Sequence, residues 1–213
     1  MERWATFDCY GTLIDWNGGV GRELERLFGA AAVPELLHRF HEIEPELQRR
    51  QPAATYREIL TKVLPRLAPL PAEEHDALAR SLPSWEPFPE VPAALEEARA
   101  RNWKLAILSN TDRDFIEASM KRIGVPFELA IVASEIGSYK PGHGHWHAFA
   151  ERVRADTHVH VAASLFHDVA PATELGLPTI WINRLGERPG PEPTVELTDL
   201  TGLGSALDAL VSE

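Results

Sequence analysis

Short runs of apolar residues alternate with helical patterns through the second half of the chain. Four such runs predict buried strands, at residues 105–108, 129–132, 158–162 and 179–182. Helical patterns follow the first three, at residues 111–123, 145–154 and 168–175, and Gly124 and Gly176 stand where two of these helices should end. Strands that alternate with helices of about ten residues are typical of a parallel sheet covered on both faces. The pattern therefore predicts an α/β fold.

A first strand, at residues 5–9, stands apart from that series because a long helical section follows it. In this section four apolar residues recur at helical spacing and predict one buried helix face: Leu36, Phe40, Ile43 and Leu47. Pro45 lies inside the pattern and predicts a break or kink there. Further helices are expected at 56–64 and 72–82, before a proline-rich connector at 82–92. We therefore expect a core of residues 1–15 and 86–213 interrupted by a helical cap of residues 16–85.

Composition and charge narrow the classes of partner. The 213 residues suffice for one core with an insertion, and the formal net charge of −11 argues against nucleic acid and membrane surfaces as partners. Cys9 is the one cysteine, so no intramolecular disulfide can form, and neither a signal peptide nor a run of ~20 apolar residues is visible. These features predict a cytoplasmic protein. If its substrate is a small anion, an acidic chain of this kind needs a local positive site.

Polar residues follow the predicted strands at the points where those strands end. Asp8 closes the first strand, Ser109 and Asn110 follow the second, Lys140 comes after the third and Asp168 after the fourth. Ligands of open parallel sheets bind beyond the carboxyl ends of the strands. The sequence thus predicts an active site in which a carboxylate nucleophile, hydroxyl and amide donors, one cation and a second carboxylate meet.

These residues carry a resemblance to the haloacid dehalogenase superfamily. The segment 7–15, Phe-Asp-Cys-Tyr-Gly-Thr-Leu-Ile-Asp, resembles its first motif, and the later motifs are matched in order by 108–110, 140–141 and 167–168. The resemblance covers essentially the whole chain. It implies a Rossmann-like parallel core with a helical cap inserted after the first strand.

Tyr10 favours one reaction type within that superfamily. Its phosphatases usually carry a second aspartate two positions after the nucleophile, where it acts as general acid and base, whereas the type II L-2-haloacid dehalogenases carry tyrosine, as here. An alkoxide leaving group needs a proton, and a phenol with a pKa of ~10 is a poor acid for that task. A halide leaves without a proton. The resemblance therefore implies a hydrolytic dehalogenase that converts short L-2-haloacids to 2-hydroxy acids.

The resemblance also implies a role for each residue of the predicted site. Asp8 would displace the halide and form an ester that water then hydrolyses. Lys140 would keep Asp8 ionised, and Asp168 would orient or activate the water. The residues implied to bind substrate are Tyr10, Thr12, Arg39, Ser109 and Asn110, with Arg39 aligned with the arginine that receives the halide. No cofactor is expected for this reaction.

The loop before Asp168 departs from the superfamily pattern. Well-known dehalogenases carry serine and asparagine there, whereas Leu165 stands at the asparagine position and His167 is new. Ser164 and His167 are therefore candidates for activating the hydrolytic water. This departure leaves the water-activating residue and the halogen preference open.

Two other functions stay open at this point. In one, the chain is a Mg²⁺-dependent phosphatase of a small phosphomonoester, with Asp8 and Asp168 as metal ligands. In the other, it is a catalytically silent binding protein that keeps the fold. His143, His145 and His147 alternate at a helix start, but three such histidines seldom form a metal site unless another ligand converges. His158 and His160 alternate on one face of a predicted strand and are interpreted as structural. A homodimer is also left open.

Overall fold

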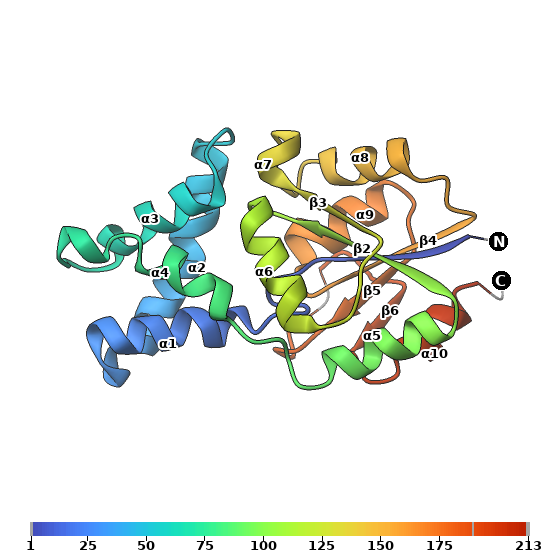
Figure 1. Cartoon of the computed structure of the whole chain (residues 1–213), viewed down its shortest axis with the longest axis horizontal. Coiled ribbons are helices and arrows are strands. Elements are labelled where there is room, and N and C mark those ends of the chain that lie inside the picture. Colours follow the sequence, from blue (N-terminus) through green and yellow to red (C-terminus); the bar gives the residue numbers. More distant parts are fainter. Residues whose placement is uncertain (1, 189, 212–213) are drawn as a thin grey trace.

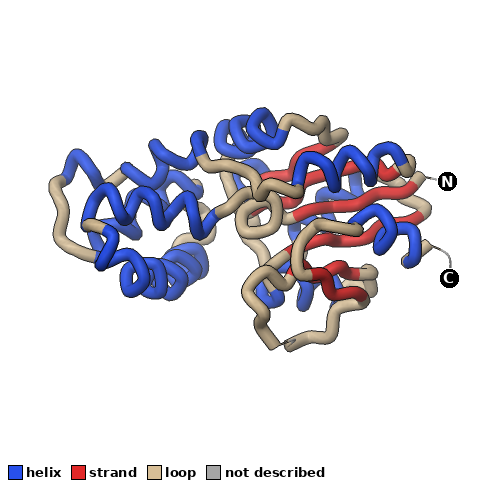
Figure 2. The backbone as a smooth tube through the Cα atoms, turned by 90° about the horizontal axis from the view of Figure 1, so that it is seen from below, coloured by secondary structure: helices blue, strands red, loops and turns tan. Residues whose placement is uncertain are grey.

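The computed structural model describes residues 2–188 and 190–211 and contains one six-stranded parallel sheet. The strands pair in the order β3-β2-β1-β4-β5-β6 (Figures 1 and 2). Their bounds are β1 Arg3–Phe7, β2 Trp103–Ser109, β3 Leu129–Val132, β4 Thr157–Ala162, β5 Thr179–Ile182 and β6 Val195–Leu197. Continuous apolar strands suit this sheet because helices cover both faces. The chain has the α/β fold predicted from its sequence.

Helices pack on the two faces of the sheet in separate layers (Figure 1). Trp4 of β1 and Leu108 of β2 point into one apolar cluster, which α8 and α9 cover. Ala5 and Phe7 of β1 point into the other cluster, together with residues of α5, α6 and α10. The bounds are α5 Val91–Ala100, α6 Arg113–Ile123, α7 Ala133–Ile136, α8 Gly144–Arg152, α9 Ala170–Glu174 and α10 Leu203–Ala209. A wide helical turn, Leu165–Val169, precedes α9.

The helices between β1 and α5 form a separate group at one end of the molecule, on the left in Figure 1. They are α1 Trp16–Phe28, α2 Val33–Arg50, α3 Tyr56–Leu67 and α4 Ala77–Ser81, joined by the short turns 30–32, 72–74 and 82–84. Two chain segments connect this group to the sheet. The Asp15 amide donates to the Glu86 carbonyl at 2.9 Å, and the Phe88 amide donates to the Leu13 carbonyl at 3.0 Å. The group occupies the segment expected to be the cap, and its two connections are hydrogen-bonded side by side.

Some local predictions fail for identifiable reasons. α2 continues through Pro45 to Arg50, so the helix does not break there. Proline removes one backbone donor, and the burial of Phe40 and Leu47 on either side holds the helix together. The segment 168–175 is not one helix but a wide turn followed by α9. Five elements were not predicted individually: α1, α5, α7, β6 and α10.

The strand register brings the predicted polar residues to one edge. Phe7 pairs with Ile107 of β2 on one side and with Val161 of β4 on the other. Asp8 therefore lies between the ends of both neighbouring strands. Within the described ranges, no helix is long and apolar enough to cross a membrane.

Candidate active site

A cavity of about 240 Å³ lies between this sheet edge and the helices of the cap segment. Its wall includes most of the predicted site residues, among them Asp8, Tyr10, Ser109, Asn110, Lys140 and Asp168. Ser164 and His167 line it as well. Side chains from four strand ends thus reach one cavity, as the sequence predicts.

Asp8 is fixed by hydrogen bonds to both of its carboxylate oxygens. The Thr12 hydroxyl donates to Oδ2 at 3.0 Å, and the Lys140 ammonium donates to Oδ1 at 2.9 Å. Thr12 in turn accepts from the Ala163 amide at 2.9 Å, so the loops after β1 and β4 are tied together. Asp8 is 8% exposed and lines the cavity. It is a positioned, largely buried carboxylate, which suits a nucleophile.

Lys140 is shared between two carboxylates. Its ammonium lies 2.9 Å from Asp8 and 2.5 Å from Asp168, and it also donates to the Leu108 carbonyl at 2.8 Å. Burial raises the pKa of Asp8, and the Lys140 charge opposes that rise. Burial alone would raise the pKa of Asp168 too, but Lys140 and the hydrogen bond from His160 hold it well below its usual range. The pKa of Lys140 is raised, because the two carboxylates outweigh its burial.

His160 connects Asp168 to a chain of buried groups inside the sheet. Its Nε2 lies 3.0 Å from Asp168 Oδ1, and an ionised carboxylate only accepts, so Nε2 carries the hydrogen. In the neutral ring, Nδ1 then accepts from the Thr6 hydroxyl at 2.9 Å. Thr6 in turn accepts from His158 Nε2 at 2.8 Å. Sequence reasoning treated both histidines as structural. The structure shows that His160 supports Asp168 from behind.

Tyr10 lines the cavity, but its hydroxyl group is engaged elsewhere. That hydroxyl lies 3.0 Å from the Ser119 hydroxyl of α6. Burial raises the pKa of Tyr10 well above its ordinary value. The phenol is therefore an even weaker acid here than in water, and it cannot replace the second aspartate of a phosphatase.

Ser109 and Asn110 have different surroundings. Ser109 lines the cavity, and its hydroxyl is buried without a hydrogen-bond partner. Asn110 is paired with the backbone of Lys140: its amide nitrogen donates to the Lys140 carbonyl at 3.0 Å, and its oxygen accepts from the Lys140 amide at 2.6 Å. Asn110 thus fixes the loop that carries the lysine.

Ser164 and His167 form a local turn at the edge of the cavity. The His167 amide donates to the Ser164 hydroxyl at 3.0 Å, and the imidazole Nδ1 lies 3.1 Å from that hydroxyl. Burial lowers the pKa of His167 from its ordinary value. A neutral imidazole beside Asp168 can orient a water molecule. The structure thus places the residue that departs from the superfamily pattern in the cavity wall.

Two predicted substrate-binding residues do not line the cavity. Thr12 is fully buried and acts through its hydrogen bond to Asp8, whereas Arg39 binds elsewhere. Its guanidinium donates to the Leu67 carbonyl at 2.5 Å and to the Arg66 carbonyl at 2.9 Å, at the end of α3. Helix C-termini attract cations because their last carbonyls lack partners. In this structure Arg39 stabilises the cap rather than the site.

Sequence reasoning missed the wall that the cap segment contributes. That wall is formed by Trp16, His41, Glu44, Gln48 and Tyr56. Glu44 and Gln48 follow Phe40 at intervals of four residues on α2, and all three are buried. Two polar residues that continue an apolar helix face were the available signal.

The described residues were also tested as metal ligands. In 2–188 and 190–211, no three His, Cys, Asp or Glu side chains converge in a way that could hold a metal ion. His145 is buried and lies 3.0 Å from the Ser109 carbonyl, whereas His143 lies 3.2 Å from Glu174. The alternating histidines thus point to different partners. Between Asp8 and Asp168, the Lys140 ammonium already fills the position of a bridging cation.

Comparison with known proteins agrees with this geometry. Residues 3–163 match the family model of the haloacid dehalogenase-like hydrolases. The chain belongs to this family. An (S)-2-haloacid dehalogenase of Pseudomonas sp. (strain YL) is 30% identical over 91% of this chain and 89% of its own length. The (S)-2-haloacid dehalogenase 4A of Burkholderia cepacia is 24% identical over 88% of this chain and 85% of its own.

Solved structures share the fold of this haloacid dehalogenase-like hydrolase. The L-2-haloacid dehalogenase of Xanthobacter autotrophicus with chloropropionic acid covalently bound superposes with a TM-score of 0.86. The match covers 99% of this chain and 100% of that one at 17% identity. At this identity the likeness concerns the fold.

Proposed function

We propose that this haloacid dehalogenase-like hydrolase converts short L-2-haloacids to 2-hydroxy acids through a covalent ester on Asp8. The observation that carries the proposal is the Asp8 carboxylate, which Thr12 and Lys140 hold in place at the cavity wall. The residue two positions after Asp8 is Tyr10, which does not act as a general acid. The activities named for the 30% and 24% identical relatives support it.

The first step forms the ester. An Asp8 oxygen attacks C2 of the substrate from the side opposite the halogen, and the halide leaves with the bonding electron pair. The partnerless Ser109 hydroxyl is suited to donate to the substrate carboxylate. No proton is transferred, so the acid that Tyr10 cannot provide is not needed.

The second step hydrolyses the ester. Water attacks the Asp8 carbonyl carbon, and the bond between that carbon and the ester oxygen breaks. The product keeps an oxygen of Asp8, the water oxygen replaces it in the carboxylate, and a proton is released. Asp168 and His167 lie in the same wall and can orient the water. Because Asp8 attacks C2 from the side opposite the halogen in the first step, the configuration at C2 is inverted in the product.

We further propose that no metal takes part. The Mg²⁺-dependent phosphatase would need Asp8 and Asp168 as ligands, yet both already bind Lys140. It would also need a general acid where Tyr10 stands. No observation on the site favours the phosphatase over the dehalogenase. A cytoplasmic location and a homodimer stay predictions from the sequence.

The proposal is tested by chloride release from L-2-chloropropionate in the presence of EDTA. Asp8→Asn should lower the rate by about ten-thousandfold or more, as removal of a covalent nucleophile does. Asp114→Asn, at an exposed carboxylate of α6, is the control and should keep the rate. Hydrolysis of p-nitrophenyl phosphate that requires Mg²⁺, without chloride release, would refute the proposal.

A further inference from the structure

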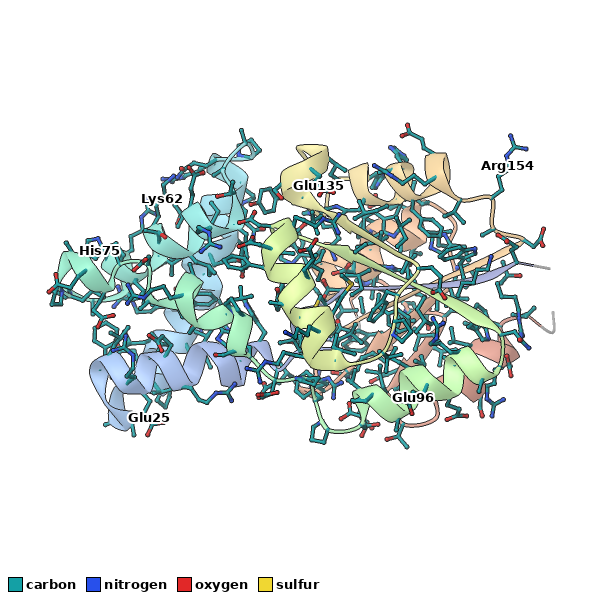
Figure 3. All side chains as sticks on the ribbon, viewed as in Figure 1. Glu25, Lys62, His75, Glu96, Glu135 and Arg154 are labelled. Atoms are coloured by element: carbon teal, nitrogen blue, oxygen red, sulfur yellow. The ribbon has the colours of Figure 1, made fainter. Side chains whose placement is uncertain are left out.

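Glu44 is a buried carboxyl in the cavity wall that the proposed reaction does not use. Glu25, Glu96 and Glu135 point outward from the surface (Figure 3), as carboxylates usually do. Glu44 is 4% exposed and faces the same cavity as Asp8. A carboxylate removed from water needs either a cation nearby or a proton of its own.

The immediate partners of Glu44 are neutral hydrogen-bond donors. The Gln48 amide donates to Glu44 Oε1, and Tyr56 lines the cavity with it. Trp16 Nε1 donates to the Tyr56 oxygen at 3.3 Å. Burial raises the pKa of Glu44 to about 7, and the neighbouring Tyr56 and Gln48 offset only part of that rise. Neutral donors beside Glu44 can stabilise an ionised carboxylate, but no positively charged side chain lies among them.

Within the described residues, no cationic side chain in the cavity wall is available to pair with Glu44. Lys140 is the one lysine or arginine in this wall, and it already lies between two carboxylates. Burial lowers the pKa of His41 and of His167, so both rings are neutral. Arg39 is bound to the end of α3, and Arg49 is exposed on α2 outside this wall. The wall therefore holds three carboxyl groups, on Asp8, Glu44 and Asp168, and one ammonium group.

This imbalance has a consequence for the substrate. A simple 2-haloacid adds a carboxylate and later releases a halide, so it brings only negative charge. A substrate that also carries an ammonium group would supply the missing cation. An ammonium at the cap wall could bind Glu44 while the substrate carboxylate reaches Ser109 at the opposite wall. A cavity of about 240 Å³ restricts such a substrate to a short chain.

We propose that Glu44 is a specificity-determining residue that binds an ammonium group, so that the preferred substrates are short 2-halo acids with a protonated amine. The part of this inference that concerns turnover rests on the proposed dehalogenase function. The part that concerns ammonium binding at Glu44 does not. The carboxylate of the substrate, its reactive C2 and its ammonium would each have a separate partner in the wall.

Binding is tested without any turnover. Lactate and isoserine, the 3-amino derivative of lactate, are the products expected from 2-chloropropionate and 3-amino-2-chloropropionate. Calorimetry on the full chain should show isoserine bound roughly tenfold to a hundredfold more tightly than lactate, the range of a charge-assisted hydrogen bond. Equal binding, or tighter binding of lactate, overturns the inference whether or not any variant folds.

Variants of two carboxylates on α2 test the assignment to Glu44. Glu44→Gln keeps the size and should remove most of the preference for isoserine. Glu44→Asp keeps the charge and should retain the direction of the preference. Glu42→Gln, at an exposed position of the same helix, should leave it unchanged. A preference that survives in Glu44→Gln shows that another group binds the amine and overturns the assignment.

Turnover separates failure of this inference from failure of the proposed function. Chloride release is measured from the two chloro acids and corrected for the rate without enzyme. For the natural chain, kcat/KM should be higher for 3-amino-2-chloropropionate than for 2-chloropropionate. For Glu44→Gln this difference should disappear. Release from 2-chloropropionate alone refutes the inference and leaves the dehalogenase intact. Tighter isoserine binding that depends on Glu44, without any chloride release, supports the ammonium site and refutes the dehalogenase.

Discussion

The two walls of the cavity differ in how their chemistry is built. The core wall consists of side chains at strand ends, where Lys140 makes direct ionic contacts with both Asp8 and Asp168. The cap wall consists of side chains on α1, α2 and α3, where Glu44 has only neutral partners. The carboxylates of the core wall are paired with a cation, whereas the carboxyl group of the cap wall has none. We infer that the core wall fixes the reaction and the cap wall selects the substrate.

Removing Lys140 should damage the core wall most. Lys140→Met leaves two buried carboxylates without a cation, which should raise the pKa of Asp8 further, because the Lys140 charge now opposes the rise caused by burial. Less Asp8 is then ionised at neutral pH, so chloride release should fall strongly and the remaining activity should rise with pH. Unfolding should also become easier by about 3–5 kcal/mol, because the buried pairs are broken.

The pH profile of kcat/KM and a denaturant titration measure the two effects. The control is Lys104→Met, at an exposed lysine paired with Glu2, and it should change both by little. If Lys140→Met kept the activity and the pH profile of the natural chain, the ionic contacts of the core wall would not govern Asp8.

The same contrast explains which parts of the site were predictable. Asp8, Lys140 and Asp168 could be found because parallel strands end at one edge and apolar runs mark those ends. For Glu44, its position on the apolar face of α2 indicated burial, but the cavity that it faces depends on how the cap packs against the core. Arg39 was expected at the site, but its position on that helix turns it to the end of α3. The cap boundaries themselves stay a prediction.

The fold shows a similar division. The five strands β1 to β5 each have four or more apolar or buried positions, and their apolar runs predict them. β6 is a three-residue edge strand with Glu196 in its middle, and it gives no such signal. His160 lies inside a predicted strand and was interpreted as structural, because the pattern does not show that Asp168 folds back against it. Contacts between distant segments set these features, not local periodicity.

Changing His160 should have a smaller effect that is confined to one step. His160→Leu removes the donor behind Asp168, and a misplaced Asp168 should slow ester hydrolysis by about tenfold to a hundredfold. The first step should be nearly unchanged, so the Asp8 ester should accumulate and be visible by mass spectrometry of the protein mixed rapidly with substrate.

His160→Gln is the matched variant, because its amide can place a donor near the position of Nε2. It should restore much of the hydrolysis and reduce the accumulation of ester. A His160→Leu protein with unchanged kcat, or with both steps slowed equally, would show that His160 does not act by positioning Asp168.

The smallest expected effect lies at the contact between the two walls. Asp112, in the core, accepts hydrogen bonds from the Tyr56 and Arg57 amides, both at 2.9 Å, and so caps the cap helix α3. Thr55 caps the Glu58 amide of the same helix, so losing Asp112 leaves that helix partly capped. Asp112→Ala should therefore cost about 1 kcal/mol and lower the melting temperature by roughly 2–4 °C. Because Tyr56 and Glu44 line the same part of the cavity, the variant should also weaken isoserine binding more than lactate binding. Asp114→Asn, next to it but exposed, should change neither. Equal weakening of both ligands would mean that Asp112 holds the cap in place without shaping the wall that selects the substrate.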